Sequence, residues 1–262
     1  MKKVMTNVLA DPHAIELRFL DAGDSGLVIE LGATVDAAVN AAVIALDAAL
    51  ARLALPAIRE TVPTYRSLLV LFDPVRMRRP ELIGIVRGLW PPAPLSEETT
   101  NHWIVPVLYG GESGVDLDHV AEVHGMTPQE VVALHSSVDY RVYMIGFAPG
   151  FAYLGGLPAA IHTSRRTDPR RATPPRSISI GGQQTAVSPP IAIPSGWHLI
   201  GQTPVRSYDP ARSERPFLFA AGDTIRFRPI DEDEYRTLVA AAEAGDEVAE
   251  RRPATGASGE AA

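Results

Sequence analysis

The order of hydrophobic and polar residues near the N-terminus predicts a hairpin followed by a helix. Apolar residues alternate with polar ones over residues 15–19 and 27–31, on either side of a turn rich in Asp and Gly. This period of two is typical of paired β-strands. Over residues 35–53 the apolar positions recur at steps of three and four, which predicts one buried face of an α-helix.

The same order of elements then repeats. Strands are predicted over residues 58–62 and 67–72, and a helix is predicted from about Pro80. Two helices on one face of an antiparallel sheet would bury both apolar stripes. We therefore predict a small α+β domain over residues 1–94, ended by the proline-rich segment 91–94, because such sequence is semi-rigid and does not continue a helix.

Short apolar runs separated by glycine, proline and charged turns fill residues 140–229. Closely spaced short strands of this kind are typical of a closed barrel or a sandwich. We predict a mainly-β domain over residues 95–232, which begins with a strand at 103–109 and two helices. The later strands are predicted at 142–147, 177–180, 184–187, 198–201, 216–219 and 224–228.

One helix start is clearly marked in this second part. Thr127 and Glu130 form a capping-box pattern, and Pro128 stands at the first helical position. Residues 233–262 are expected to contain a short helix and then, from Glu247, a disordered tail rich in Ala, Gly, Glu and Arg.

Composition narrows the classes of function. The 262 residues carry a formal net charge of −7, which argues against a nucleic-acid partner. There are no cysteines, so thiol catalysis and cysteine-ligated zinc are excluded. No run reaches the roughly 18 apolar residues of a membrane span, and no apolar signal core is present. We expect a cytoplasmic location and no membrane partner.

Lysine usage limits the chemistry further. Only Lys2 and Lys3 are lysines among the 24 basic residues, so no interior lysine serves a P-loop, a Schiff base or biotin attachment. A nucleotide phosphate bound here would be held by arginine, backbone amides, a metal or another protein chain. The sequence also lacks a His-Glu-x-x-His pattern and a Gly-x-Ser-x-Gly elbow, so neither a zinc protease nor a self-contained hydrolase triad is expected.

Five arginines crowd one short loop and point to an anion site. Guanidinium groups present a planar fork of donors that suits carboxylate and phosphate. The amides of Gly181 and Gly182 would add donors in an anion-binding nest, and Gln183 and Thr185 would add neutral polar contacts. The alternative is a solvated loop with Asp168 as its local partner. The arginines are Arg165, Arg166, Arg170, Arg171 and Arg176.

Aromatic residues alternate with glycine and proline just before this loop, in Phe147-Ala148-Pro149-Gly150-Phe151. Together with Tyr153 and Trp197, these aromatics either belong to the core or wall a pocket for a small ring or a nucleotide base. Histidine is the natural general base near neutral pH, with a packed imidazole as the alternative for each one.

Four segments closely resemble one bacterial family. They read HSSVDYRVYMIGFAPGFAYLGGLP from His135, IHTSRRTDPR from Ile161, ISIGGQQTAV from Ile178 and PSGWHLIGQT from Pro194. The family is the B subunit of the ATP-dependent 5-oxoprolinase, also called sporulation-kinase inhibitor and allophanate hydrolase subunit 1. A similar module forms half of the carboxyltransferase domain of urea carboxylase. The resemblance covers roughly residues 15–229 and implies that the mainly-β domain is a cyclophilin-like barrel.

The resemblance also implies a function. In that family the chain acts with two companion 5-oxoprolinase subunits, one carboxyltransferase-like and one a hydrolase, to open 5-oxoproline to glutamate. ATP with Mg²⁺ is consumed at the level of the complex, and no metal site is expected within this chain. The chain is then expected to supply half of a shared active site, in which donors stabilise developing negative charge. The catalytic candidates are His135, His162 and Arg166. The candidates for binding substrate or an anion are Arg165, Arg170, Gly181, Gly182, Gln183, Thr185, Phe147, Pro149, Gly150 and Trp197.

Other functions stay open at this point. The family's alternative name implies a regulatory protein that binds and inhibits a sensor histidine kinase. A role in urea or allophanate metabolism is a further possibility. The barrel alone would also fit a prolyl isomerase, but a fold by itself does not transfer function.

Overall fold

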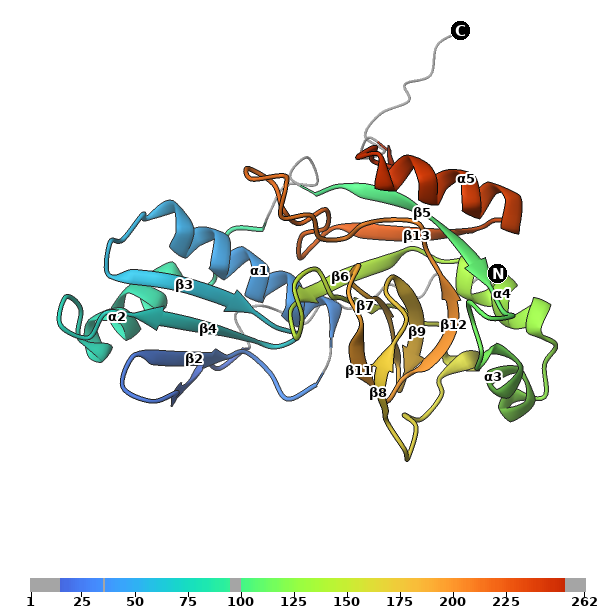
Figure 1. Ribbon diagram of the computed structural model, residues 1–262. Helices are drawn as coiled ribbons and strands as arrows, with labels where there is room; N and C mark the ends of the chain where they lie inside the picture. The colour runs from blue at the N-terminus through green and yellow to red at the C-terminus, as the bar shows by residue number, and fades with distance from the viewer. Residues whose placement is uncertain (1–14, 35, 95–99, 253–262) are drawn as a thin grey trace, which may run out of the picture. The chain divides into compact units, whose positions relative to one another are not determined.

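The computed structural model describes residues 15–34, 36–94 and 100–252, and the chain divides into two compact units after residue 96. The first unit is an antiparallel sheet in the order β1-β2-β4-β3, accompanied by two helices (Figure 1). Its elements follow the predicted order of strand, strand and helix, twice over. They are β1 (Arg18–Asp21), β2 (Gly26–Glu30), α1 (Ala37–Arg52), β3 (Ile58–Pro63), β4 (Ser67–Phe72) and α2 (Arg79–Leu89).

One core joins the sheet of this unit to its helices. The alternation in β2 and β4 sends one side of each strand into that core, as the period of two requires. The α1 helix begins at Asp36, whose side chain accepts hydrogen bonds from the amides of Ala38 and Val39 at 2.8 and 3.1 Å. This cap satisfies donors that the first helical turn leaves unpaired. The fully buried leucines of this core are Leu27, Leu46, Leu50, Leu68 and Leu82.

The second unit is a closed barrel of seven strands, in the order β12-β9-β10-β7-β6-β13-β5, with β5 returning to β12. Only the β13–β5 pair is parallel among these neighbours. The predicted barrel is therefore confirmed. The strands are β5 (His102–Tyr109), β6 (Tyr140–Ile145), β7 (Ala152–Gly155), β9 (Ser177–Gly181), β10 (Gln184–Val187), β12 (His198–Gln202) and β13 (Thr224–Pro229).

A glycine allows the barrel to close. Gly201 of β12 stands opposite Tyr109 of β5, and a Cβ atom at Gly201 would lie 2.8 Å from the carbonyl oxygen of Leu108. Any larger residue would push the two strands apart. The interior is filled by apolar side chains, and the largest fully buried ones are Trp103, Tyr140 and Phe227.

Helices and a small second sheet surround the barrel (Figure 1). The α4 helix begins with the predicted capping box, since Thr127 and Glu130 exchange hydrogen bonds. The α3 helix ends at Gly125 in the left-handed region, with φ 64°. The surrounding elements are α3 (Leu117–His124), α4 (Pro128–Ser136), a 3-10 turn (Ala159–Ile161), β8 (Arg170–Thr173) paired with β11 (Ile193–Ser195), and α5 (Glu232–Glu243).

Two predictions are corrected here. Residues 216–219 do not form a strand: Phe217 makes a single bridge with Tyr208, and the neighbouring Leu218 and Phe219 turn into the core. The expected disordered tail is wrong for its first part, because β14 (Glu250–Arg252) pairs with β5 and Ala249 is buried. β12 pairs only with the end of β5, at Leu108 and Tyr109, so the beginning of β5 is free to pair with this short charged strand. Residues 253–262 lie outside the described part of the chain.

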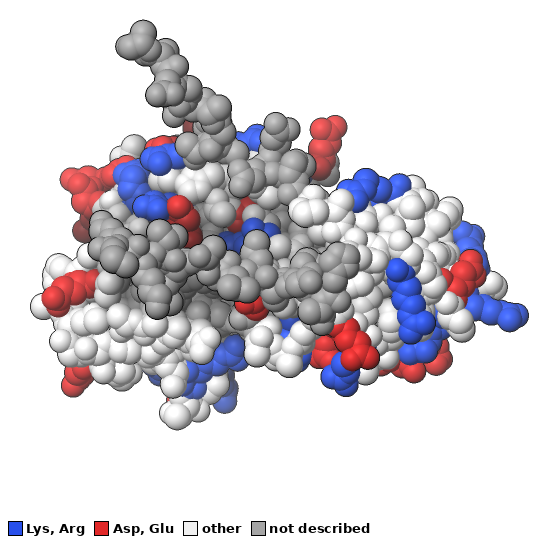
Figure 2. Space-filling view, turned by 180° about the vertical axis from the view of Figure 1, so that it is seen from behind, with Lys and Arg blue, Asp and Glu red and all other residues white. Residues whose placement is uncertain are grey.

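Figure 2 shows acidic and basic side chains interspersed on the drawn face, outside the region covered by grey atoms. Among the described residues no helix is both long and apolar enough to cross a membrane.

The docking of the tail can be measured. We expect Ala249→Asp to lower the free energy of unfolding by about 3 kcal/mol, because it places an uncompensated charge in the barrel core. Glu250→Ala, a change at the exposed neighbouring position, is the control and should leave it unchanged. The measurement is urea denaturation of the wild type and both variants. If Ala249→Asp is as stable as the wild type, residue 249 is not packed in the core.

Candidate functional site

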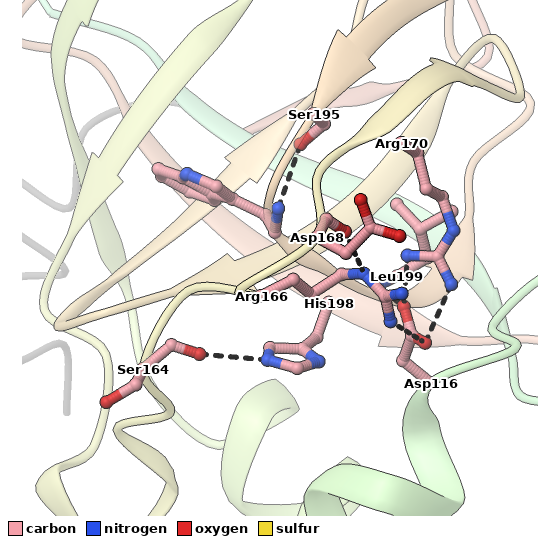
Figure 3. Close-up of polar contacts among 9 residues, drawn as sticks. Asp116, Ser164, Arg166, Asp168, Arg170, Ser195, His198 and Leu199 are labelled. Atoms are coloured by element: carbon pink, nitrogen blue, oxygen red, sulfur yellow. Dashed lines mark hydrogen bonds and ion pairs between the residues drawn. The ribbon is translucent and has the colours of Figure 1, made fainter.

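A buried carboxylate organises the surface where the arginine segment meets α3. The Asp116 side chain is 7% exposed. Its Oδ2 accepts hydrogen bonds from the backbone amide of Leu199 and from Nη1 of Arg170, both at 2.8 Å. Its Oδ1 accepts from Nη2 of Arg170 at 2.8 Å and from Nη1 of Arg166 at 3.3 Å. Figure 3 shows the carboxylate lying against both guanidinium groups.

This arrangement argues against the alternative of a solvated loop with Asp168 as its partner. Arg170 belongs to strand β8 and holds Asp116 through two parallel hydrogen bonds. Arg166 contacts Asp168 only through the backbone carbonyl, to which its Nε donates at 3.3 Å. The segment is thus fixed by a residue about fifty positions earlier in the chain.

The charges around Asp116 keep it ionised. Burial by itself raises the pKa of this carboxyl group, but the hydrogen bonds from Arg170 and Leu199 lower it, and so do the charges of Arg170 and Arg166. The net result is a pKa below the ordinary value. One carboxylate faces two guanidinium groups, so a positive charge remains to be balanced at the edge of this cluster.

A pocket of about 410 Å³ opens beside Arg166. It lies between α3 and the segment 162–168, and His198 of β12 also lines it. The only carboxylate in its lining is that of Asp168, whose residue is exposed. The polar groups that an anion would meet there belong to His119, His162, Ser164, Arg165, Arg166 and His198.

The histidines of this pocket are oriented by backbone carbonyls. Nε2 of His162 lies 2.9 Å from the carbonyl oxygen of Leu157, and Nε2 of His198 lies 2.9 Å from that of Ser164. The ring of His119 stacks on that of His198, with centroids 5.1 Å apart. Burial lowers the pKa of His198 below its ordinary value, although the Ser164 carbonyl and Asp116 oppose this effect.

An aromatic cluster supports the other side of Arg165. Its guanidinium carbon lies 5.5 Å from the centre of the Trp197 ring, a cation–π distance. Phe151 and Tyr153 pack on Trp197. Gly181 permits this packing, because a Cβ atom there would lie 2.4 Å from the Trp197 ring. Trp197 therefore helps to place Arg165 at the pocket.

The structure brings together three of the predicted site residues, namely His162, Arg165 and Arg166, in this one pocket. Arg170 instead braces Asp116. The expected nest at Gly181 and Gly182 is not available, because the amide of Gly182 donates to the carbonyl oxygen of Thr163 at 2.7 Å. Gly181 is the last residue of β9 and pairs with Gln184 of β10. Gln183 is exposed in the turn between these two strands.

His135 and Thr185 belong to the barrel core and not to the pocket. Both are fully buried. Thr185 donates to the carbonyl of Ser179, so its hydroxyl oxygen accepts from Nε2 of His135 at 2.9 Å, and the Tyr109 hydroxyl donates to Nδ1 at 2.7 Å. Burial lowers the pKa of His135 to about 3. A neutral imidazole with both nitrogens engaged holds the core together, and this structural role replaces the predicted catalytic one.

The segment of Phe147, Pro149 and Gly150 forms the β6–β7 turn. The side chain of Phe147 is 66% exposed, and its φ of 70° lies in the left-handed region that favours glycine. Gly150 packs so closely on Tyr208 that a Cβ atom would lie 2.6 Å from that residue's own Cβ. Neither Phe147 nor Pro149 lines the arginine pocket.

Sequence reasoning missed the residues that complete the pocket. His119 lies on a helix that reads as an ordinary amphipathic one, and Asp116 reads as a turn residue before it. Their connection to the arginines depends on contacts between distant segments, for which the sequence carries no local pattern. His198 could have been predicted from the sequence, because it is a histidine that follows Trp197 in a stretch containing two glycines.

The pocket fits a carboxylate or a phosphate group. Guanidinium groups of Arg165 and Arg166 and the hydroxyl of Ser164 are donors suited to such oxygens. Within the described ranges, no three His, Asp or Glu side chains cluster closely enough to hold a metal ion. The residues present therefore suit the phosphate part of a nucleotide and supply no carboxylate cluster for Mg²⁺.

Comparison with known proteins gives the family. The family described as carboxyltransferase domain, subdomain C and D, matches residues 17–219, and the chain belongs to it. Within that class the chain belongs with the proteins named as the B subunit of 5-oxoprolinase. The protein of that name from Escherichia coli O157:H7 is 41% identical over 183 residues, which is 68% of this chain and 81% of the relative. The one from Bacillus subtilis (strain 168) is 36% identical over 228 residues, or 81% of this chain and 92% of the relative.

Solved structures share the fold of this chain. TTHA0988 superposes with a TM-score of 0.71 at 34% identity, over 79% of this chain. The chain spans only 40% of that protein. The K. lactis urea amidolyase has a TM-score of 0.77 over 93% of this chain and 16% of its own, but at 18% identity it shows a common fold only.

The contribution of Asp116 to stability can be measured against pH. We expect Asp116→Asn to reduce the free energy of unfolding near pH 7 by about 2–3 kcal/mol, because two guanidinium groups lose their counter-ion. The stabilisation by the carboxylate is present above the unfolded pKa of about 3.9 and is lost as the pH falls through the lower folded value. The gap between wild type and variant should therefore narrow near pH 3 in urea denaturation.

Asp168→Asn is the matched control, since Arg166 uses the backbone and not the side chain of Asp168. It should leave stability unchanged at both pH values. A gap between wild type and Asp116→Asn that stays constant on acidification would contradict the assigned role of the Asp116 charge.

Proposed function

We propose that this chain is one component of a 5-oxoprolinase complex that opens 5-oxoproline to glutamate with hydrolysis of ATP. The observation that carries the proposal is its 36–44% identity to three proteins named as the B subunit of 5-oxoprolinase. The letter in that name implies companion subunits, for which we propose one carboxyltransferase-like chain and one hydrolase chain. ATP with Mg²⁺ would be bound by the complex as a whole.

The chemistry of the pocket supports a shared site. Opening a lactam with ATP passes through oxygen-rich anions, both phosphate and carboxylate, which need donors that are already in place. Arg165 and Arg166 are such donors, and their surroundings hold them before the ligand arrives. Trp197 supports the first and Asp116 the second. The pocket contains no pairing of a nucleophile with an activating base, which a partner would have to supply.

The role of each residue follows from its contacts. Arg166 would bind the anion through Nη2, since its Nη1 donates to Asp116 and its Nε to the Asp168 carbonyl. Asp116 acts as a positioning residue. His162, held by the Leu157 carbonyl, lines the same pocket. The pocket is too polar to exclude water by itself, so a companion chain would cover it during the reaction.

The two other candidate functions, a role in urea metabolism and inhibition of a histidine kinase, have weaker support. The likeness to urea amidolyase at 18% identity is a likeness of fold, and no feature of the pocket favours a urea-derived substrate over 5-oxoproline. Inhibition of a histidine kinase stays a prediction from the family's alternative name. The exposed Phe147 is the kind of residue such binding would use.

The isolated chain should be nearly inactive. We expect no 5-oxoproline-dependent ATP hydrolysis from the purified chain, and full activity once both companion subunits are added. The reason is that the pocket holds anion donors without a nucleophile. Phosphate release is the measurement, and robust turnover by the chain alone would refute a shared site.

Arg166 provides the sharper test in the reconstituted complex. Arg166→Ala removes a charge-assisted contact worth roughly 1.5–3 kcal/mol, so kcat/KM should fall about tenfold to a hundredfold. Arg166→Lys should rescue poorly, because an ammonium group cannot reproduce the planar fork. Arg52→Ala, at the exposed end of α1, is the matched control and should be silent.

Thermal melts and pull-downs of the companion chains separate the possible causes. Arg170→Ala should lower stability as well as activity, because Arg170 holds both oxygens of Asp116. Full activity of Arg166→Ala would remove this residue from the site. Loss of activity through loss of assembly would assign it to the interface with a companion chain.

A further inference from the structure

One ring nitrogen of a histidine that lines the pocket is buried without a hydrogen-bond partner. His198 is only 4% exposed and lines the pocket, and its Nδ1 is among the few buried side-chain polar atoms of the described residues that make no hydrogen bond. Figure 3 shows its other nitrogen directed at Ser164. Leaving such an atom unpaired is costly, so a group with no partner at a ligand pocket points to the ligand.

The contact with Ser164 fixes which nitrogen carries the proton. A backbone carbonyl oxygen can only accept, so the proton of neutral His198 is on Nε2. Nδ1 then carries a lone pair and can only accept a hydrogen bond. An ionised oxygen of a ligand is also an acceptor. The two can meet only if one additional proton lies between them.

The groups around the ring decide how readily that proton is taken up. His119 on α3 stacks on the ring, Arg166 lies in the adjoining segment, and Asp116 precedes α3. His119 and Arg166 disfavour a charged imidazole, whereas Asp116 favours it. The pocket also contains His162, Arg165 and Asp168. With no anion present, burial and the two like charges outweigh the Ser164 carbonyl and Asp116, which lowers the pKa of His198 and keeps it neutral near pH 7.

We propose that this pocket binds an oxyanion together with one proton, which is held between Nδ1 of His198 and an oxygen of the anion. Arg165 and Arg166 supply the remaining charge-assisted donors. The ligand class is a carboxylate or a phosphate, whose oxygens share this chemistry. This deepens the anion site of the proposed function, on which it rests, and adds His198 as the residue that couples binding to pH.

The direction of the pH dependence follows. The anion raises the pKa of His198, so binding takes up a proton between the free and the bound pKa values. Affinity for an anion whose own charge is constant should therefore rise as the pH falls. The limit is about tenfold per pH unit, which corresponds to one proton per anion.

Calorimetry on the isolated full-length chain tests this without companion subunits. Sulfate serves as the tetrahedral probe and 5-oxoproline as the carboxylate probe, because neither changes charge between about pH 5.5 and about pH 8.5. Titrations in two buffers of different ionisation enthalpy give the number of protons taken up. We expect affinity to fall as the pH rises across this range, with uptake approaching one proton per anion. The probe that binds more tightly identifies the source of the oxyanion.

Two substitutions separate the nitrogens of His198. His198→Gln keeps a donor near the position of Nε2, which can still bond Ser164, but removes Nδ1. It should weaken binding at least tenfold and abolish proton uptake. His198→Asn places an amide near the position of Nδ1, and it should retain part of the binding without pH dependence. His102→Gln, at a histidine of β5 that does not line this pocket, is the control and should keep both the affinity and the proton uptake.

Several results would overturn the proposal. They are unchanged proton uptake in His198→Gln, loss of uptake in His102→Gln, and failure of both probes to bind the wild type at tens of millimolar. If the variants fold poorly, nitrogen NMR of wild-type His198 decides instead. It should report an Nε2–H tautomer without anion and a doubly protonated ring with it, and a neutral ring in both states would refute the coupling. An inactive reconstituted complex, by contrast, would count against the proposed function and leave this inference standing.

Discussion

The site depends on the burial of one carboxylate. Asp116 connects α3 to β12 through Leu199, and connects both to the arginine segment through Arg166 and Arg170. A charge can remain buried only if its oxygens are fully hydrogen-bonded, and both Asp116 oxygens are. The need to satisfy this carboxylate therefore fixes the positions of segments that would otherwise be free to move relative to the barrel.

The barrel supplies the rigid frame on which this interaction acts. Gly201 lets β12 close against β5, and β12 carries His198 and Leu199 at its beginning. The arginine segment is attached a second time by the bridge between Thr163 and Gly182. Functional residues on a loop gain precision when the loop is pinned at more than one point to regular structure. Both attachments here flank the pocket.

Local patterns predicted what local physics controls. The periods of two and of three to four gave the hairpins, α1 and most barrel strands, and the capping box gave the start of α4. Strand β8 was missed because its two arginines read as a solvated loop, and its pairing with β11 is set by tertiary contact. Strand β14, three charged residues, carries no apolar alternation at all. Asp116 and His119 were missed because their partners are far away in sequence, and His135 was misassigned because burial cannot be read from residue type.

Charge balance explains why neutral histidine and fixed arginine occur in one pocket. Two guanidinium groups beside a single carboxylate already leave a surplus of positive charge. A permanently charged imidazole at His198 would add to that surplus in a place with little access to water, at a cost that folding would have to bear in every molecule. A group that is neutral until an anion enters avoids this cost and still completes the donor set when the ligand is bound. The same burial that lowers the basicity of His198 in the empty pocket thus makes its charge dependent on the ligand.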